Sequence, residues 1–166
     1  MIVGTSCSKT KDPSAQDGST GRNYTLGKKV LFGTSGDSER FRVSGWSTTE
    51  KEITWTEGPS AVLEFTGIPS SRSLRLNATL AALVAPPQLP AQPVEVYANG
   101  KKIADWEVDG KAEFTALVPS RTDRDGDSVR IEFRIPKSVS PKQLGLSDDP
   151  RVLGVSCFDL VLNKID

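Results

Sequence analysis

The segment Val129-Arg130-Ile131-Glu132-Phe133-Arg134-Ile135 alternates apolar and charged side chains without a break. Successive side chains of a strand point to opposite faces of a sheet, so this pattern predicts a strand with one face in a core and the other in water. Shorter or similar apolar patterns recur along the chain, at residues 29–32, 40–43, 61–65, 74–80, 94–97, 103–108, 114–118 and 152–162. The sequence therefore predicts an all-β protein.

The segments between these strands carry turn signals. Asn99-Gly100 predicts a tight hairpin, because both residues tolerate positive φ. Residues 86–90 (PPQLP) predict a loop, since proline cannot donate to a sheet ladder. Ser140-Pro141 followed by Gly145 predicts one short helical turn with a capping serine and a terminating glycine. The apolar parity of the last strand shifts at Cys157-Phe158, which indicates a β-bulge or a strand buried on both faces.

The composition fits this interpretation. The chain has 166 residues, of which 36% are hydrophobic, 14 are glycine and 11 are proline. About eight to ten short strands with frequent turns indicate two packed antiparallel sheets, and we expect a β-sandwich of jelly-roll topology over residues 24–166. Residues 1–23 contain almost no apolar side chain after Val3, so we predict a disordered leader there.

Charge and residue usage exclude several classes of function. Lysine plus arginine and aspartate plus glutamate number 21 each, so no basic excess marks a nucleic-acid partner. The chain contains no histidine, which excludes Ser-His-Asp catalysis and the usual zinc ligand sets. No segment approaches the roughly 18 consecutive apolar residues of a membrane span. Oxygen-ligated calcium and carboxylate chemistry remain compatible with the sequence.

The two cysteines lie in different settings. Cys157 falls in an apolar strand and is predicted to be a small core residue. Cys7 lies in the polar leader, and residues 2–9 (IVGTSCSK) resemble the end of a bacterial lipoprotein signal, which makes Cys7 a candidate lipid anchor. The alternative for Cys7 is an ordinary flexible terminus.

The order of several short motifs resembles a recurring bacterial module. These motifs are Gly45-Trp46, Glu50, residues 55–59, 61–63 and 94–100, Trp106, residues 131–136, Ser140-Pro141, Leu144-Gly145 and residues 149–154. The resemblance is to galactose-binding-like or carbohydrate-binding jelly rolls that accompany surface-polysaccharide glycosyltransferases and phosphoglycerol-transferase-like proteins. It implies a bacterial, extracytoplasmic setting (periplasmic, cell surface or secreted) and a glycan as partner.

Two tryptophans are candidates for contact with a sugar. A pyranose ring presents an apolar C–H face that stacks on an indole, and flanking polar groups bind its hydroxyls. Trp46 with Arg42 and Glu50 is the predicted site, and alanine at Trp46 is expected to abolish binding with little change in melting temperature. Trp55 is a further ligand candidate, although its strand-like surroundings favour packing in the core or against a sheet.

Asp123, Asp125 and Asp127 occupy alternate positions in one loop. This spacing lets carboxylates converge on Ca²⁺, which takes six to eight oxygen ligands. Ser128 stands where a full EF-hand loop has glycine, so a solvated Asp-Gly turn is the alternative. Calcium is therefore a candidate cofactor.

The sequence favours a binding module without catalysis. We predict a carbohydrate-binding domain, and the alternative is a structural or protein-interaction domain of a polysaccharide assembly system. A carboxylate glycosidase is a third class, for which Glu50 and Glu52 form the nearest acidic pair.

Overall fold

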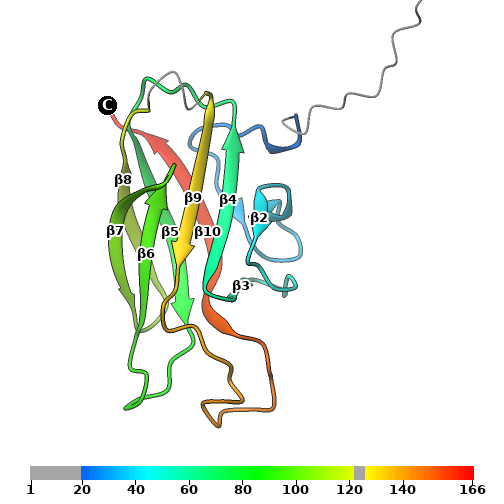
Figure 1. Cartoon of the computed structure of the whole chain (residues 1–166). Helices are drawn as coiled ribbons and strands as arrows, with labels where there is room; N and C mark the ends of the chain where they lie inside the picture. Colours follow the sequence, from blue (N-terminus) through cyan, green and yellow to red (C-terminus); the bar gives the residue numbers. More distant parts are fainter. Residues whose placement is uncertain (1–19, 122–125) are drawn as a thin grey trace, which may run out of the picture.

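The computed structural model describes residues 20–121 and 126–166, which form two packed five-stranded sheets (Figure 1). Every strand pair is antiparallel, which confirms the predicted all-β sandwich. The β10 sheet contains β1 (Val30–Leu31), β10 (Leu153–Lys164), β5 (Leu74–Ala82) and β8 (Ala112–Val118) in that order, with β3 (Thr54–Glu57) also beside β10. The β9 sheet contains β2 (Arg42–Ser44), β4 (Ser60–Thr66), β9 (Ser128–Arg134), β6 (Gln92–Ala98) and β7 (Lys101–Val108).

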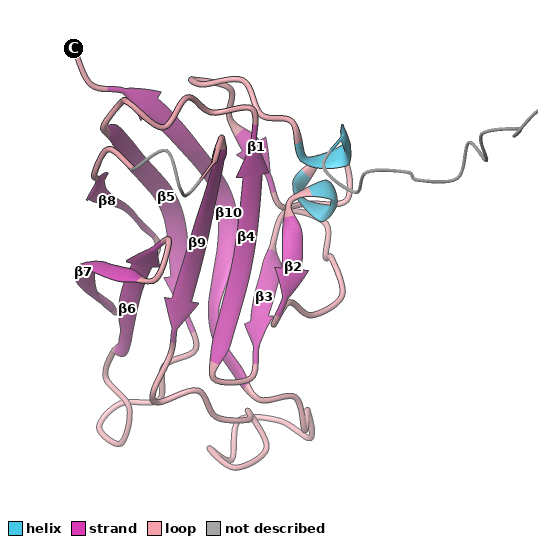
Figure 2. Ribbon diagram, turned by 45° about the horizontal axis from the view of Figure 1, so that its top comes forward, coloured by secondary structure: helices cyan, strands magenta, loops and turns pink. Residues whose placement is uncertain are grey.

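The core lies between the two sheets (Figure 2) and follows the period of two in the sequence. On β9, the side chains of Val129, Ile131 and Phe133 are fully buried. Arg130 and Arg134, which point to the other face of the strand, are exposed. The apolar residues of β5 pack against them from the opposite sheet. Burial of this alternating face is the main stabilising contribution to the sandwich.

The predicted turns and irregularities are confirmed. Asn99 (φ 47°) and Gly100 (φ 82°) close the hairpin between β6 and β7. The register of β10 against β5 shifts between Cys157 and Asp159, so a β-bulge explains the change of parity at Phe158. Cys157 is fully buried, as expected for a small core residue.

The capped turn after β9 has the predicted hydrogen bonds. The Gln143 backbone N–H donates to Ser140 Oγ (3.1 Å), and the Leu146 N–H reaches back to Pro141 O (2.9 Å) around Gly145 (φ 71°). This is a capping box closed by a Schellman motif. It remains a hydrogen-bonded turn; the two 3₁₀ helices of the described chain are instead η1 (Thr20–Arg22) and η2 (Ser38–Arg40).

Two residues at the end of the predicted leader contact the sandwich. Arg22 Nη1 lies 2.6 Å from Glu64 Oε2, and Asn23 forms a bridge with Thr66, although both residues were predicted to belong to the leader. Residues 1–19 of that leader, which include Cys7, lie outside the described residues. Within the described ranges, no helix has the length and apolar character needed to cross a membrane.

Candidate functional site

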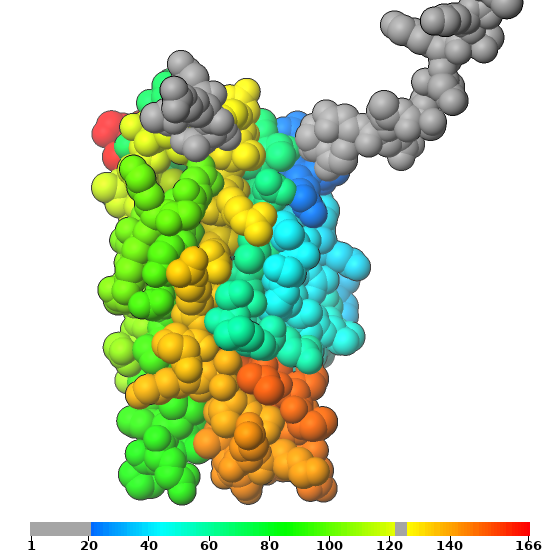
Figure 3. Space-filling view, viewed as in Figure 1, coloured from blue at the N-terminus to red at the C-terminus, as the bar shows by residue number. Residues whose placement is uncertain are grey.

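Residues 45–57 form a hairpin, here called the edge hairpin, that leads from one sheet to the other. Its start depends on Gly45, which has φ 76° and whose Cβ, if present, would collide with the carbonyl oxygen of Ser60. After Gly45 the chain runs beside β3, with Trp46 bridged to Thr56. The edge hairpin occupies the side of the sandwich next to β2 and β4, coloured cyan in the space-filling view (Figure 3).

The tip of the edge hairpin is held by the loop that follows β1. The Glu50 N–H donates to Ile53 O (2.8 Å) and closes the turn, while the Thr34 N–H donates to Glu50 O (3.0 Å). Gly33 packs so closely that a Cβ there would collide with Lys51 O. These contacts fix the tip before any ligand binds, which lowers the entropic cost of binding.

The two tryptophans of the edge hairpin point in opposite directions. Thr54 and Thr56 are fully buried, so the strand alternation directs Trp55 to the outer face of the β10 sheet. Trp46 lies opposite Thr56 and shares its inward direction. Trp55 is half-buried and does not belong to the hydrophobic core, whereas Trp46 packs against it.

Trp46 is partly a structural residue. Its ring centroid lies 5.2 Å from that of Phe32 and 6.5 Å from that of Phe133, and its Nε1–H donates to Val62 O (3.0 Å). Because the indole packs between the sheets, we now expect alanine at this position to lower the melting temperature. Trp106, unlike Trp46 and Trp55, is a core residue, and only 7% of its surface is exposed.

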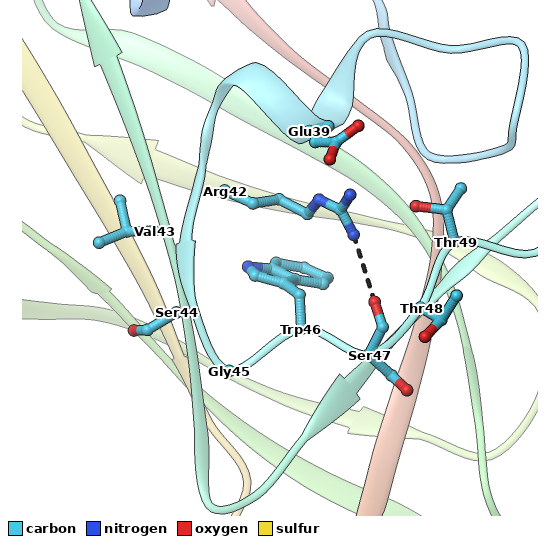
Figure 4. A pocket seen from close by; sticks show the side chains of 9 residues that line it. All are labelled: Glu39, Arg42, Val43, Ser44, Gly45, Trp46, Ser47, Thr48 and Thr49. Carbon is cyan, nitrogen blue, oxygen red and sulfur yellow. Dashed lines mark hydrogen bonds between the residues drawn. The ribbon is translucent and has the colours of Figure 1, made fainter. Parts of the chain in front are cut away.

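The exposed part of Trp46 lines a hollow of about 600 Å³, here called the edge hollow. In Figure 4, the Arg42 side chain lies between Glu39 and the indole of Trp46, while Val43 and Ser44 point away. The complete lining consists of Glu39, Arg42, Val43, Ser44, Gly45, Trp46, Ser47, Thr48 and Thr49. The hollow thus combines an aromatic surface with a guanidinium, a carboxylate and hydroxyl groups.

Arg42 and Glu39 keep most of their hydrogen-bonding capacity for a ligand. Arg42 Nη1 donates to Ser47 O (3.3 Å), but no salt bridge among the described residues includes Arg42 or Glu39. A guanidinium has five N–H donors and a carboxylate only acceptors. The edge hollow can therefore donate and accept hydrogen bonds from side chains that do not neutralise each other.

Ser47 accepts hydrogen bonds from two arginines. Besides the bond from Arg42, its Oγ accepts from Arg151 Nη1 (2.9 Å). Arg151 also forms a forked ion pair with Asp149 (2.7 Å from Nη2 to Oδ2), and this pair lowers the pKa of the Asp149 carboxyl through hydrogen bonds to its charged form. Arg151 Nη2 lies 3.9 Å from Glu50 Oε1, so Glu50 contributes to this network.

The structure brings together two of the four predicted ligand contacts. Arg42 and Trp46 line the edge hollow, whereas Glu50 lies at the hairpin tip and Trp55 on the outer face. Sequence reasoning missed Glu39, which η2 brings to the hollow. It also missed the adjacent Thr48-Thr49 pair, whose position between two candidate residues was an available signal.

The predicted calcium loop is only partly described. Asp123 and Asp125 lie outside the described residues, and Asp127 is exposed, with its carbonyl oxygen accepting from the Ile68 N–H (2.9 Å). Across residues 20–121 and 126–166, no group of three or more acidic or cysteine side chains is placed to hold a metal ion.

The likeness of this chain to known proteins lies in its fold. No family model and no curated protein sequence matches it. The CBM22-1 xylan-binding domain from Paenibacillus barcinonensis Xyn10C superimposes with a TM-score of 0.54 at 9% identity, over 84% of this chain and 94% of that domain. The CBM36-1 domain of a multidomain xylanase from the hindgut metagenome of Trinervitermes trinervoides gives 0.51 at 11% identity, over 84% and 98%.

A family 6 carbohydrate-binding module gives a TM-score of 0.50 at 8% identity, over 87% of this chain and 98% of the module. At these identities the similarity establishes the shared jelly-roll β-sandwich and leaves the ligand open.

Proposed function

We propose that this protein is a carbohydrate-binding module without catalytic activity and that the edge hollow is its glycan site. The observation that carries the proposal is the hollow itself, where an indole, a guanidinium and a carboxylate that are not paired with each other line one concavity. The fold supports it, because three carbohydrate-binding modules share the same sandwich.

Each group of the edge hollow suits one feature of a pyranose. The exposed part of the Trp46 indole accepts the apolar C–H face of the ring. Arg42 donates to hydroxyl oxygens and Glu39 accepts from hydroxyl hydrogens, while Thr48 and Thr49 can do either. Vicinal hydroxyls need both donors and acceptors, so this mixed lining fits a neutral sugar better than a single-sign lining would.

Binding without catalysis fits the position of the acidic side chains. Glu50 and Glu52 are exposed at the tip of the edge hairpin, and Glu50 already interacts with Arg151. Glycosidases need two carboxyl groups flanking the scissile bond, one of them with a raised pKa. A role on glycans outside the cytoplasm is part of the proposal, and calcium remains a candidate cofactor.

The test is a glycan array followed by calorimetry with xylan, with calcium and with a chelator. Arg42→Ala removes a charged donor and is expected to weaken binding roughly 10- to 100-fold. Arg75→Ala is the matched control, because Arg75 is exposed on β5 of the other sheet. Both variants are expected to melt within about 2 °C of the wild type.

Two results would overturn the proposal. One is a folded wild-type protein that binds nothing on the array, which would favour the structural or protein-interaction alternative. The other is an Arg42→Ala variant that binds as tightly as Arg75→Ala, which would remove the edge hollow as the site. If the wild-type protein binds glycan in calcium and loses that binding when the chelator is added, the result would support a calcium site.

A further inference from the structure

Three large apolar side chains lie together on the outer side of the β10 sheet without belonging to the hydrophobic core. They are Ile53, Trp55 and Phe158, here called the outer strip, and each is half-buried. Ile53 precedes Trp55 by two residues and lines the same hollow as Phe158. Trp55 lies opposite Ser156 of β10, close to Phe158 in the sequence.

The β-bulge explains why an aromatic ring lies on this face. Cys157 and Leu160 are fully buried, and the extra residue of the bulge between them places Phe158 outside the core alternation. A half-exposed aromatic ring buries less apolar surface than a core residue, so it contributes less to the stability of the fold. Because Ile53 and Trp55 lie on the same face, Phe158 is part of an apolar surface that a ligand can contact.

Phe158 borders a second hollow, of about 420 Å³, here called the tip hollow. Its other lining residues are Glu50, Lys51, Glu52 and Ile53, all from the tip of the edge hairpin. The exposed Lys111 places its Nζ 3.9 Å from the Phe158 ring centroid. The ring face is therefore reachable from solvent, and an exposed cation–π contact is weak enough to be exchanged for a ligand.

The two hollows are continuous along the chain. Thr49 lines the edge hollow and Glu50, the next residue, lines the tip hollow. The linings of the two hollows therefore meet at the tip of the edge hairpin. The core of a protein–protein interface is depleted of charges, whereas the tip hollow has side chains of both signs around its aromatic ring, which suits sugar hydroxyls.

We infer that the tip hollow and the outer strip form a second contact surface for the same glycan chain, with Phe158 stacking on a sugar ring beyond the one bound at Trp46. This inference rests on the proposed function and extends it, because it makes the ligand a polymer that spans both faces of the edge hairpin. A short oligosaccharide occupies the edge hollow alone, and a longer one gains affinity from the second surface.

The experiment compares ligand lengths by calorimetry, with the dimers and hexamers of xylose, glucose and mannose as probes. Phe158→Ala and Ile53→Ala are each expected to weaken binding of the hexamer about fivefold or more and to leave the dimer unchanged. Leu117→Ala is the control, because Leu117 is 58% exposed on β8 of the same sheet. Circular dichroism shows whether each variant folds. If Phe158→Ala does not fold, the comparison is made with Ile53→Ala alone.

The outcomes separate the two proposals. If Arg42→Ala weakens both lengths while Phe158→Ala and Ile53→Ala bind the hexamer like the wild type, the second surface is wrong and the proposed function stands. Equal losses for dimer and hexamer in the outer-strip variants would also contradict the second surface. If the wild type binds no probe of either length, both proposals fail.

Discussion

Trp46 and Trp55 lie on the two arms of one hairpin, and their side chains point in opposite directions. Trp46 contacts Phe32 and Phe133 between the sheets, while Trp55 lies on the outer face beyond the core. The difference follows from the pairing register, since Trp46 lies opposite the inward-facing Thr56, whereas Trp55 is the residue next to it on β3. The direction in which an aromatic side chain of this hairpin points is therefore set by its pairing and cannot be predicted from its residue type.

The largest expected effect separates the two tryptophans by stability. Trp46→Ala removes a ring packed on two aromatic neighbours and a hydrogen bond to Val62 O, so the free energy of unfolding should fall by about 3 kcal/mol. Trp55→Ala removes a half-buried ring outside the core, and about 1 kcal/mol is expected. Urea unfolding measures both, and equal losses would contradict the assignment of opposite directions.

A smaller effect tests the network on the Trp55 face of the edge hairpin. The pKa of Asp149 is lowered from its ordinary 3.8 by hydrogen bonds from Arg151, so the folded state favours the charged carboxylate. The stability from this pair is present above about pH 4 and is lost as the pH falls through the lowered pKa. We expect Asp149→Asn to be less stable than the wild type near pH 6 and to approach it near pH 3.

The measurement is urea unfolding of both proteins across that range, with Asp148→Asn as the control. Asp148 is exposed and forms no salt bridge within the described residues. A stability difference between Asp149→Asn and the wild type that stayed constant with pH would show that the Asp149–Arg151 pair does not titrate as described.

The sequence was sufficient for the fold because its signals are local. The alternation at 129–135, the Asn99-Gly100 hairpin, the bulge at Phe158 and the capped turn at Ser140 each follow from a few neighbouring residues. Local patterns of this kind survive into the folded state when they agree with one another.

The site could be predicted only in part because it depends on tertiary contacts. Arg42 and Trp46 were found from residue type, but Glu39 reaches the edge hollow through η2, which has no strong sequence signal. The inward direction of Trp46 depends on the positive φ of Gly45 and on its bridge to Thr56. Neither feature is visible in a pattern of apolar and polar residues.

The most direct test of glycan binding at the edge hollow is a titration of ¹⁵N-labelled protein with xylohexaose, which follows the indole N–H signals of its three tryptophans. Trp106 is buried and bonded to Thr115 O (3.2 Å), so its signal serves as the internal control. The account predicts that the Trp46 signal shifts and that the Trp106 signal does not. Binding of the glycan with an unmoved Trp46 signal would contradict it.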